Sequence, residues 1–424
     1  MKRKESILPR GRFISLLLCL LLAVGGLTGC PTFDKTIEDD ADTSDDDNDD
    51  NDSAADDDDD DNDNDDTAPG FGDYVLWAMG RDRQTDAGVL LVSDGGSWFN
   101  YPLSPDLPGE NWNLIAGGAS AVGRGMLVGN IDHDGSSLGF GLRVKENALT
   151  PEVPSFQSND WEVSGVSFLP SGTATLGWVV ATDLDDQAGA IFRLGTDDWN
   201  QEDITFTGEK WSLVAISMLD QYTGFAFGSI NVIGQSKTNG LALRKSGSTW
   251  VRKSLLPGLL NSWALKDGQM VDETNVWAVG AEEKLVGKNT GLVLHGDGAD
   301  DWSQFDVPDI GSQNWLLNSV SFVSSIFGFA VGDDLDNDEG VILVFDGPVE
   351  SASWEKMTVL GLANTWSAQQ VEMRSNTDGY LVGYTIDTKQ GLLLHFNGDA
   401  WKVVSLDSVY QCSDWMLSGF AYVP

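Results

Sequence analysis

Seven tryptophans recur at a nearly constant spacing, and this period constrains the fold more than any other feature of the 424-residue chain. Consecutive members lie 49, 50, 52, 52, 51 and 49 residues apart. A fixed period near 40 to 50 residues is typical of β-propeller blades, each of which is one small sheet. The period therefore predicts seven copies of one unit, which begin at Trp112, Trp161, Trp211, Trp263, Trp315, Trp366 and Trp415.

Each copy has the pattern of four short strands. In the copy that begins at Trp315, an alternating segment is followed by residues 328–332 (Gly-Phe-Ala-Val-Gly), then by 340–344 (Gly-Val-Ile-Leu-Val), and Trp354 opens a last short strand. Such apolar segments between glycines and aspartates indicate β-strands, and no helical period interrupts them. A glycine precedes the third strand in every copy: Gly88, Gly139, Gly189, Gly240, Gly291, Gly340 and Gly391.

The two ends of the chain complete the count. Only one strand can follow Trp415, and residues 73–111 contain the three strands that this last copy lacks. The C-terminal strand is thus predicted to close the ring as the innermost strand of the N-terminal blade, which leaves few exposed sheet edges. We predict an all-β protein, a seven-bladed β-propeller of four-stranded antiparallel blades over residues 73–424.

The repeat also resembles a known superfamily. The segments 275–280 (Asn-Val-Trp-Ala-Val-Gly), 291–295 (Gly-Leu-Val-Leu-His) and 396–401 (Phe-Asn-Gly-Asp-Ala-Trp) resemble blades of the bacterial neuraminidase-repeat, or Asp-box, type. Within it they are most similar to the photosystem II stability/assembly-factor blades and to propeller lipoproteins of myxobacteria. The resemblance spans residues 73–424 and implies the fold, because one propeller scaffold carries many activities.

The first 29 residues have the pattern of an export signal. Five basic residues precede an apolar stretch over 13–24, which is too short for a confident membrane span. The stretch ends in Leu27-Thr28-Gly29-Cys30, which resembles the lipobox of bacterial lipoproteins. This resemblance implies cleavage before Cys30 and a lipid on it, with palmitate among the acyl chains. The alternative is an ordinary signal peptide with a cysteine there by chance.

The predicted lipoprotein has an expected location and an expected state of its cysteines. Residue 31 is proline and not the aspartate that retains such proteins at the inner membrane, so we expect the outer membrane of a Gram-negative cell envelope. Cys19 would leave with the signal and Cys30 would carry the lipid. Cys412 is therefore expected to be unpaired.

Residues 30–72 form a separate acidic zone. Residues 31–66 contain 20 acidic residues and one basic residue, whereas the whole chain has a net charge of −41. Such a segment cannot bury enough apolar surface to offset its chain entropy, so we expect a disordered linker between the membrane and the propeller. Low-affinity calcium buffering is the alternative function of this segment. The overall acidity excludes nucleic acid as a partner.

The loops between second and third strands carry many further acids: Asp82, Asp86, Asp132, Asp134, Asp183, Asp185, Asp186, Glu282, Glu283, Asp333, Asp334, Asp336, Asp338, Glu339 and Asp387. Strand direction alternates within a blade, so these loops are expected on one face with the linkers into the first strands. Solvated charge that maintains solubility is one interpretation of this face. Recognition of a cation or of a basic partner is the other.

One of these loops resembles a calcium site. Asp334, Asp336 and Asp338 alternate along a segment that ends in glycine, and calcium prefers several carboxylate oxygens on a tightly turning backbone. The segment departs from the EF-hand pattern, because Phe345 stands where the bidentate glutamate belongs. No other cofactor is indicated, and calcium is the single candidate.

The seven repeated tryptophans (Trp112, Trp161, Trp211, Trp263, Trp315, Trp366 and Trp415) are the second candidate site. Exposed aromatic rings at a channel mouth stack on sugars, so a glycan-binding ring is one interpretation. A residue that all seven copies contain also fits packing between neighbouring blades.

Features of an enzyme are weak in this sequence. The chain has three histidines, and no nucleophile elbow, phosphate-binding loop or zinc-ligand spacing occurs. We therefore predict a monomeric, non-enzymatic binding or scaffold propeller that recognises a protein partner through its acidic loops. A lectin-like propeller is the alternative, and a glycoside hydrolase or lyase is the third.

Overall fold

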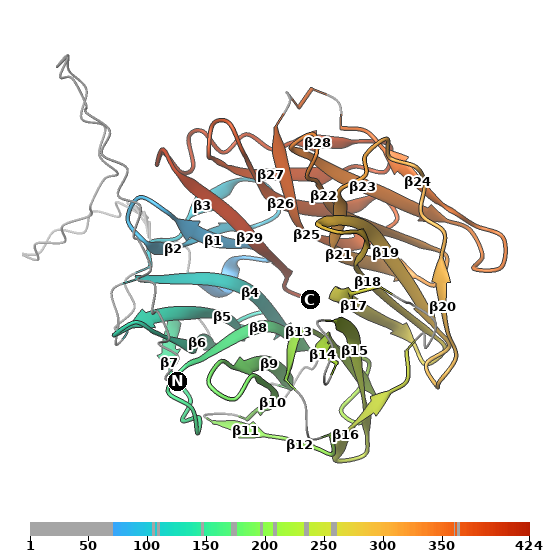
Figure 1. Ribbon diagram of the computed structural model, residues 1–424. Helices are drawn as coiled ribbons and strands as arrows, with labels where there is room; N and C mark the ends of the chain where they lie inside the picture. Colours follow the sequence, from blue (N-terminus) through green and yellow to red (C-terminus); the bar gives the residue numbers. More distant parts are fainter. Residues whose placement is uncertain are drawn as a thin grey trace, which may run out of the picture. The chain divides into compact units, whose positions relative to one another are not determined.

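The computed structural model describes residues 71–424, except 104–106, 108–110, 146–147, 171–175, 196–197, 207–209, 233–236, 256–260, 360 and 363–364. Seven sheets surround a common axis, and each has the four-stranded antiparallel core that the sequence predicts (Figure 1). The predicted signal, the lipid site at Cys30 and most of the acidic linker lie outside the described residues. Within the described part, no helix has the length and apolar character that crossing a bilayer would need.

In every blade the strands follow one another from the channel outward. The first three blades are β29 (Trp415–Tyr422), β1 (Leu76–Asp82), β2 (Ala87–Ser93), β3 (Trp98–Asn100); β4 (Asn111–Ala121), β5 (Arg124–His133), β6 (Ser136–Lys145), β7 (Ala148–Glu152); and β8 (Trp161–Phe168), β9 (Gly177–Asp183), β10 (Ala188–Leu194), β11 (Trp199–Gln201).

The fourth blade is β13 (Trp211–Met218), β14 (Gly224–Asn231), β15 (Thr238–Ser246), β16 (Thr249–Lys253), and the last three are β17 (Trp263–Asp272), β18 (Asn275–Leu285), β19 (Lys288–Gly296), β20 (Trp302–Phe305); β21 (Trp315–Ser324), β22 (Phe327–Asp334), β23 (Glu339–Asp346), β24 (Trp354–Met357); and β25 (Trp366–Ser375), β26 (Asp378–Thr385), β27 (Gly391–Phe396), β28 (Trp401–Val403). A short strand, β12 (Asp203–Ile204), pairs in parallel with β16 and gives the fourth sheet a fifth strand.

The ring closes as the sequence predicts. The C-terminal strand β29 pairs antiparallel with β1, from Leu76 opposite Tyr422 to Asp82 opposite Trp415. The folded part begins slightly before the predicted boundary at residue 73, because the 3-10 turn η1 (Phe71–Asp73) places Phe71 fully inside the core. Its ring lies 5.0 Å from that of Trp77 on β1. Both ends of the described chain therefore contribute to one blade.

A glycine and a tryptophan meet at every boundary between blades. The tryptophan that opens each inner strand lies on the glycine that precedes the third strand of the preceding blade. A Cβ atom added to any of these glycines would lie 2.0–2.5 Å from a tryptophan ring atom. The pairs are Gly88 with Trp112, Gly139 with Trp161, Gly189 with Trp211, Gly240 with Trp263, Gly291 with Trp315, Gly340 with Trp366 and Gly391 with Trp415. Two separate sequence repeats are thus one contact, made seven times.

A β-bulge near the middle of each inner strand shapes the channel wall. In the sheet of β17 the register shifts between Leu265 and Asp267. The bulge brings the carbonyl oxygen of Ala264 so close to Gly280 that a Cβ there would lie 2.0 Å from it. Bulges re-aim the side chains next to them. The same shift occurs in all seven sheets, so it determines which inner-strand residues line the channel.

Candidate functional site

The aspartate-rich loops form a repeated turn. In three blades, the aspartate at the end of the second strand is buried and its Oδ1 atom accepts hydrogen bonds from the backbone N–H groups two and three residues later. These aspartates are Asp82, Asp183 and Asp334, with N···O distances of 2.7–3.2 Å. Short polar side chains often stabilise turns in this way. Much of the alternating aspartate pattern is therefore explained by local backbone structure.

The same turns link neighbouring blades. The residue four positions after the buried aspartate has a positive φ angle, for example 55° at Asp86 and 53° at Asp338. Its carbonyl oxygen accepts a hydrogen bond from the backbone N–H of the next inner-strand tryptophan, at 2.9 Å for Asp86 with Trp112 and at 3.1 Å for Asp338 with Trp366. The loop thus holds in place the tryptophan that packs between two blades.

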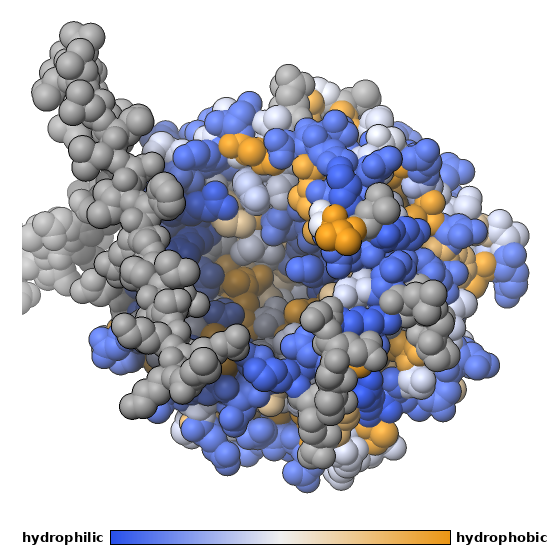
Figure 2. Space-filling view, in the orientation of Figure 1, coloured by the Kyte–Doolittle hydropathy of each residue, from blue (hydrophilic) through white to orange (hydrophobic). Residues whose placement is uncertain are grey.

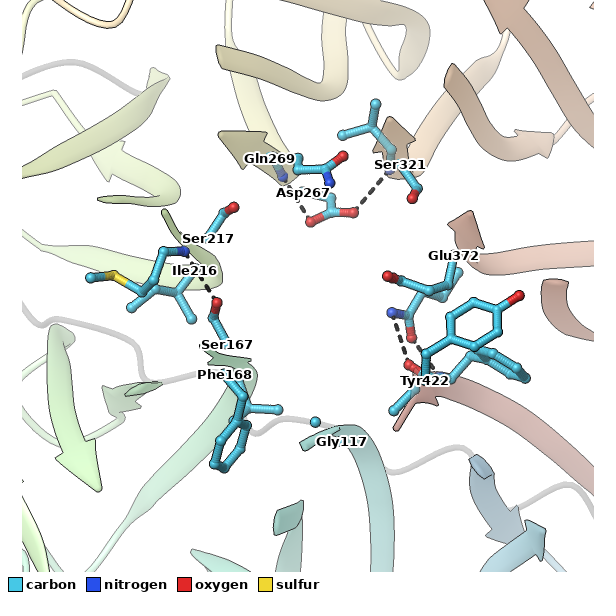
Figure 3. A pocket seen from close by; sticks show the side chains of 18 of the residues that line it. Gly117, Ser167, Phe168, Ile216, Ser217, Asp267, Gln269, Ser321, Glu372 and Tyr422 are labelled. Atoms are coloured by element: carbon cyan, nitrogen blue, oxygen red, sulfur yellow. Dashed lines mark hydrogen bonds between the residues drawn. The ribbon is translucent and has the colours of Figure 1, made fainter. Parts of the chain in front are cut away.

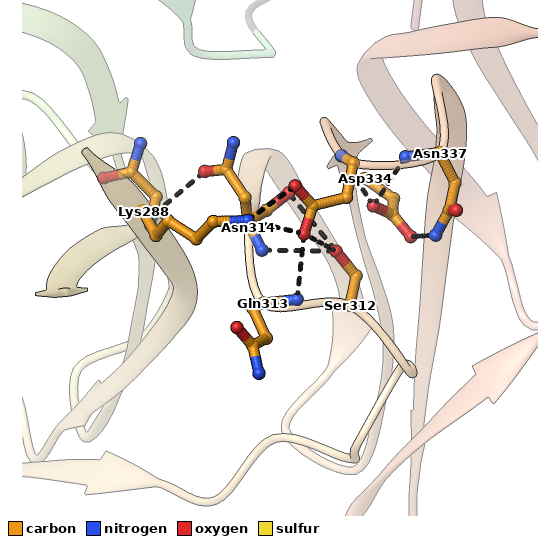
Figure 4. A network of polar contacts seen from close by, with 8 residues as sticks. Lys288, Ser312, Gln313, Asn314, Asp334 and Asn337 are labelled. Atoms are coloured by element: carbon orange, nitrogen blue, oxygen red, sulfur yellow. Dashed lines mark hydrogen bonds and ion pairs between the residues drawn. The ribbon is translucent and has the colours of Figure 1, made fainter. Parts of the chain in front are cut away.

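The structure does not assemble the calcium site predicted at Asp334, Asp336 and Asp338. Asp334 accepts from Asn337, through both its backbone and its side chain, and Asp336 lies 2.9 Å from the Lys288 ammonium group (Figure 4). The hydrogen bond from Lys288 lowers the pKa of Asp336. Across the described residues, no three acidic, histidine or cysteine side chains converge as metal ligands would. The pattern is that of a turn with an ion pair.

The acidic face consists of loops from several blades. In the described loops between second and third strands, three exposed residues are basic (Arg83, Lys284 and Lys389), whereas eight are acidic: Asp132, Asp134, Asp185, Asp186, Asp336, Asp338, Glu339 and Asp387. We call these eight residues the acidic loop face. Beside it lies a hollow of about 540 Å³, whose wall includes Arg81, Asp132, Asp160 and Glu162. This face can attract and hold a cationic group.

The seven repeated tryptophans do not present their rings to solvent. Their exposed fractions range from 1% for Trp161 to 8% for Trp112, because each ring lies between two blades. A ring that stacks on a sugar must expose one face. The geometry of these seven residues is therefore that of interblade packing.

A central channel runs between the seven inner strands. All seven contribute to the wall of a cavity of about 330 Å³ near the ends of these strands (Figure 3). A smaller cavity of about 160 Å³ lies toward their beginnings and shares Gly117, Asp267 and Gln370 with the first. In Figure 2 a hollow lies at the centre of a largely hydrophilic surface.

Most polar side chains of the channel are engaged with the next blade. Ser167, Ser217, Gln269 and Ser321 occupy one repeat position, six residues after the inner-strand tryptophan. Each accepts a hydrogen bond from a backbone N–H of the following inner strand, at 2.5–3.1 Å. The innermost strand is a sheet edge with unpaired backbone groups, so these side chains satisfy donors that no strand can reach.

Two carboxyl groups in the channel have perturbed titration. Burial raises the pKa of Asp267 to about 6, against the opposing effect of hydrogen bonds from Val320 and Ser319 at 2.9 and 2.8 Å. Burial, and then the charge of Asp267, raises the pKa of Glu372 to about 8. Neither residue was predicted from the sequence as part of a site. Glu372 could have been found as the one acid at a repeat position that carries serine in three other blades.

The prediction that Cys412 is unpaired is wrong. Cys412 is 4% exposed and forms a disulfide. The chain has two other cysteines, Cys19 and Cys30, and both lie outside the described residues. The prediction failed because it assigned one of them to the cleaved signal and the other to the lipid.

The likeness of this chain to known proteins is distant. No known family matches the sequence, and no curated protein does. Among solved structures, the chain is similar to YCF48 from Cyanidioschyzon merolae (13% identity over 73% of this chain and 88% of that one, TM-score 0.48) and to YCF48 bound to a D1 peptide (12%, 61% and 74%, TM-score 0.38). It is also similar to the Hadza microbial sialidase Hz136 (9%, 77% and 75%, TM-score 0.45). At these identities the likeness concerns the fold alone.

Proposed function

We propose that this propeller is a non-enzymatic binding platform that recognises a basic segment of a protein partner through the acidic loop face. The observation that carries the proposal is the excess of eight exposed acids over three exposed bases in the described part of those loops. Several like charges on one surface create a field that attracts the opposite charge and accelerates encounter. The adjoining hollow lined by Asp132, Asp160 and Glu162 offers room for a side chain of the partner.

The rigid construction of the face supports the same proposal. The buried aspartates hold their turns through two backbone hydrogen bonds each, and the turns are tied to the next blade through the tryptophan N–H groups. The exposed acids that follow Asp183 and Asp334 are therefore presented on preorganised loops, which lowers the entropic cost of binding. A glycan-binding alternative would need aromatic rings other than the seven repeated tryptophans.

A charge-removal experiment tests this proposal. The full chain would be compared with a variant in which Asp132, Asp134, Asp185 and Asp186 are replaced by asparagine. Binding to a fluorescent oligolysine peptide would be measured by anisotropy at low and at high salt. We expect the variant to bind at least about tenfold more weakly, and added salt to weaken the parent protein more than the variant.

A matched control variant removes four exposed acids from the third-to-fourth strand side of the blades: Asp301, Asp346, Glu350 and Asp399. This control loses the same net charge but keeps the acidic loop face. We expect it to bind nearly as well as the parent. Equal losses in the two variants would show that the peptide responds to net charge alone, and would overturn the proposal.

We further propose that the platform is a lipoprotein of the outer membrane, anchored at Cys30 and separated from the bilayer by the acidic linker. The support is the leader sequence and its Leu-Thr-Gly-Cys ending. Metabolic labelling with an alkyne fatty acid should mark the parent protein and not a Cys30→Ser variant. Because one sulfur cannot carry both a thioether-linked lipid and a disulfide, the intact mass would also exclude Cys30 as the disulfide partner of Cys412. An unlabelled parent protein would refute the anchor.

A further inference from the structure

The channel cavity has few polar groups that are free to meet a ligand. The hydroxyl groups of Ser167, Ser217 and Ser321 and the amide of Gln269 all accept from the next inner strand. Gln370 is engaged in the same way, because its Oε1 atom accepts from the backbone N–H of Phe420 at 2.7 Å. These groups form part of the scaffold between blades.

Two neighbouring groups depart from this pattern. Glu372 occupies the same repeat position as the three serines, but no hydrogen bond reaches its carboxyl group from any described residue. The buried hydroxyl oxygen of Tyr422, on the adjacent strand β29, likewise has no partner in the described part of the chain. Both residues line the cavity, but the Tyr422 hydroxyl points away from it, whereas Glu372 and Asp267 face the same space (Figure 3). A buried polar group without a partner is costly unless a ligand or water satisfies it.

None of the described residues that line the cavity is basic. Arg374, two residues after Glu372, is exposed and lies 3.8 Å from Asp378. Burial raises the pKa of both Glu372 and Tyr422. The charge of Asp267 raises the pKa of Glu372 further. Asp378, Glu372 and Tyr380 raise the pKa of Tyr422, and Arg374 lowers it. The cavity therefore presents two acids, and two cations lie nearby: Arg374, which pairs with Asp378, and the exposed Lys266, which lines the adjoining smaller cavity that shares Asp267.

Most of the remaining exposed wall is polar, and apolar side chains form a small part of it. They include Val166, Phe168 and Ile216 of strands β8 and β13, and Phe168 and Ile216 lie on the side away from Glu372 (Figure 3). We propose that the channel binds a small organic cation, with an ammonium or guanidinium group between Asp267 and Glu372. Such a ligand would give the Glu372 carboxylate its missing donor. The site is separate from the acidic loop face.

The pH dependence of binding follows from the two carboxyl groups. A cation binds the ionised forms, so its affinity rises with pH until both groups are deprotonated. Asp267, with a pKa of about 6, ionises first, and Glu372, with a pKa of about 8, ionises later. We expect the association constant to increase from pH 6 through pH 8, where Glu372 is half ionised, and to level off above about pH 9. Binding at pH 7 should release protons.

Calorimetry with agmatine would test the site, because this small molecule carries a guanidinium group and an ammonium group on an aliphatic chain. The full-length protein would be titrated at pH 6, 7, 8 and 9, with neutral 1,4-butanediol as the control ligand. We expect saturable binding of agmatine alone. Glu372→Gln should reduce the association constant at pH 8 by at least about tenfold, and should shift the rise with pH down to the titration of Asp267.

Three further variants make the result decisive. Glu372→Ser introduces the residue that three other blades have at this position, so we expect this variant to fold even if Glu372→Gln does not. It should also lose agmatine binding. Glu355→Gln removes one exposed acid on β24 and should bind as the parent does. The fourfold asparagine variant of the acidic loop face should also keep agmatine binding, which separates this site from the proposed function.

Agmatine affinity that is equal in the parent and in both Glu372 variants would overturn the proposal, as would equal binding of 1,4-butanediol. Loss of agmatine binding in the fourfold face variant would assign the ligand to the acidic loop face and would also overturn it. Calcium chloride in place of agmatine should give no heat that depends on Glu372. A calcium response lost in Glu372→Gln would identify a metal site in place of an organic cation site.

Discussion

The contact between Gly291 and Trp315 allows a sharp test of how the blades are held together. Trp315 is 3% exposed, and a Cβ atom on Gly291 would lie 2.1 Å from its ring. Trp315→Ala should therefore leave a cavity between two blades, whereas Gly291→Ala should push the ring out of its place. In the double variant, the new methyl group occupies part of the space that the ring has vacated. Each substitution is thus expected to compensate for the other.

The expected magnitudes follow from burial and crowding. Removal of a buried tryptophan side chain costs about 3–5 kcal/mol of the free energy of unfolding. The added methyl group should cost about 1–3 kcal/mol in the parent protein, because overpacking forces side chains from their preferred positions. In the Trp315→Ala background the same methyl group should cost about zero or stabilise slightly. The two substitutions should therefore be non-additive by about 1–3 kcal/mol.

Urea denaturation followed by tryptophan fluorescence and by circular dichroism would measure these four free energies. A control cycle combines Trp315→Ala with Gly240→Ala, because Gly240 contacts Trp263 and belongs to another blade boundary. This pair should be additive within about 0.5 kcal/mol. Additivity in the Gly291 cycle as well would refute the interblade packing. A Trp315→Ala variant of nearly unchanged stability would refute it too.

Three further results are expected. Glu372 has a pKa of about 8 in the folded protein against an ordinary value of 4.5, so the folded chain retains a proton that the unfolded chain releases, and stability should fall as the pH rises from about 5 to 8. Glu372→Gln should remove this loss and be more stable than the parent by on the order of 2 kcal/mol at pH 8, and equal stability at pH 5 and 8 in the parent would contradict this. Calcium at millimolar concentration should leave the unfolding temperature of the parent and of Asp336→Asn unchanged, whereas a rise in the parent alone would restore the calcium site. In the unprocessed chain, which keeps Cys19 and Cys30, Cys412 should react with iodoacetamide only after unfolding and reduction, and alkylation of Cys412 in the unfolded but unreduced chain, detected by mass spectrometry, would contradict the disulfide.

The repeat determines the architecture because it depends on short-range pattern. Alternating apolar residues, the glycine before each third strand and the tryptophan period are all local, so they predict four strands, seven blades and closure by Trp415 to Tyr422 without reference to three-dimensional contacts. The structure confirms each of these. It also explains the regular spacing, since Gly291 and Trp315 are two separate features in the sequence and one contact in space.

The roles of the acids required the tertiary structure. The alternating aspartates at Asp334 and Asp336 fit a metal loop in sequence, yet one holds its own turn and the other pairs with Lys288, which is 48 residues away. Likewise, the local sequence around Glu372 shows only an acid in an alternating strand, because its place in the channel depends on all seven inner strands. Its pKa depends on burial by blades far apart in the chain and on Asp267, more than 100 residues before it.

The sequence by itself therefore determined the number of blades, the strands of each blade and the way in which the ring closes. Only the tertiary structure showed which side chains form hydrogen bonds to the next blade and which can contact a ligand. Alternation along a strand predicts one inward and one outward face, but a bulge in every inner strand changes the direction of the side chains next to it. Residues about 50 positions away in the chain then determine whether an inward polar group already has a hydrogen-bond partner.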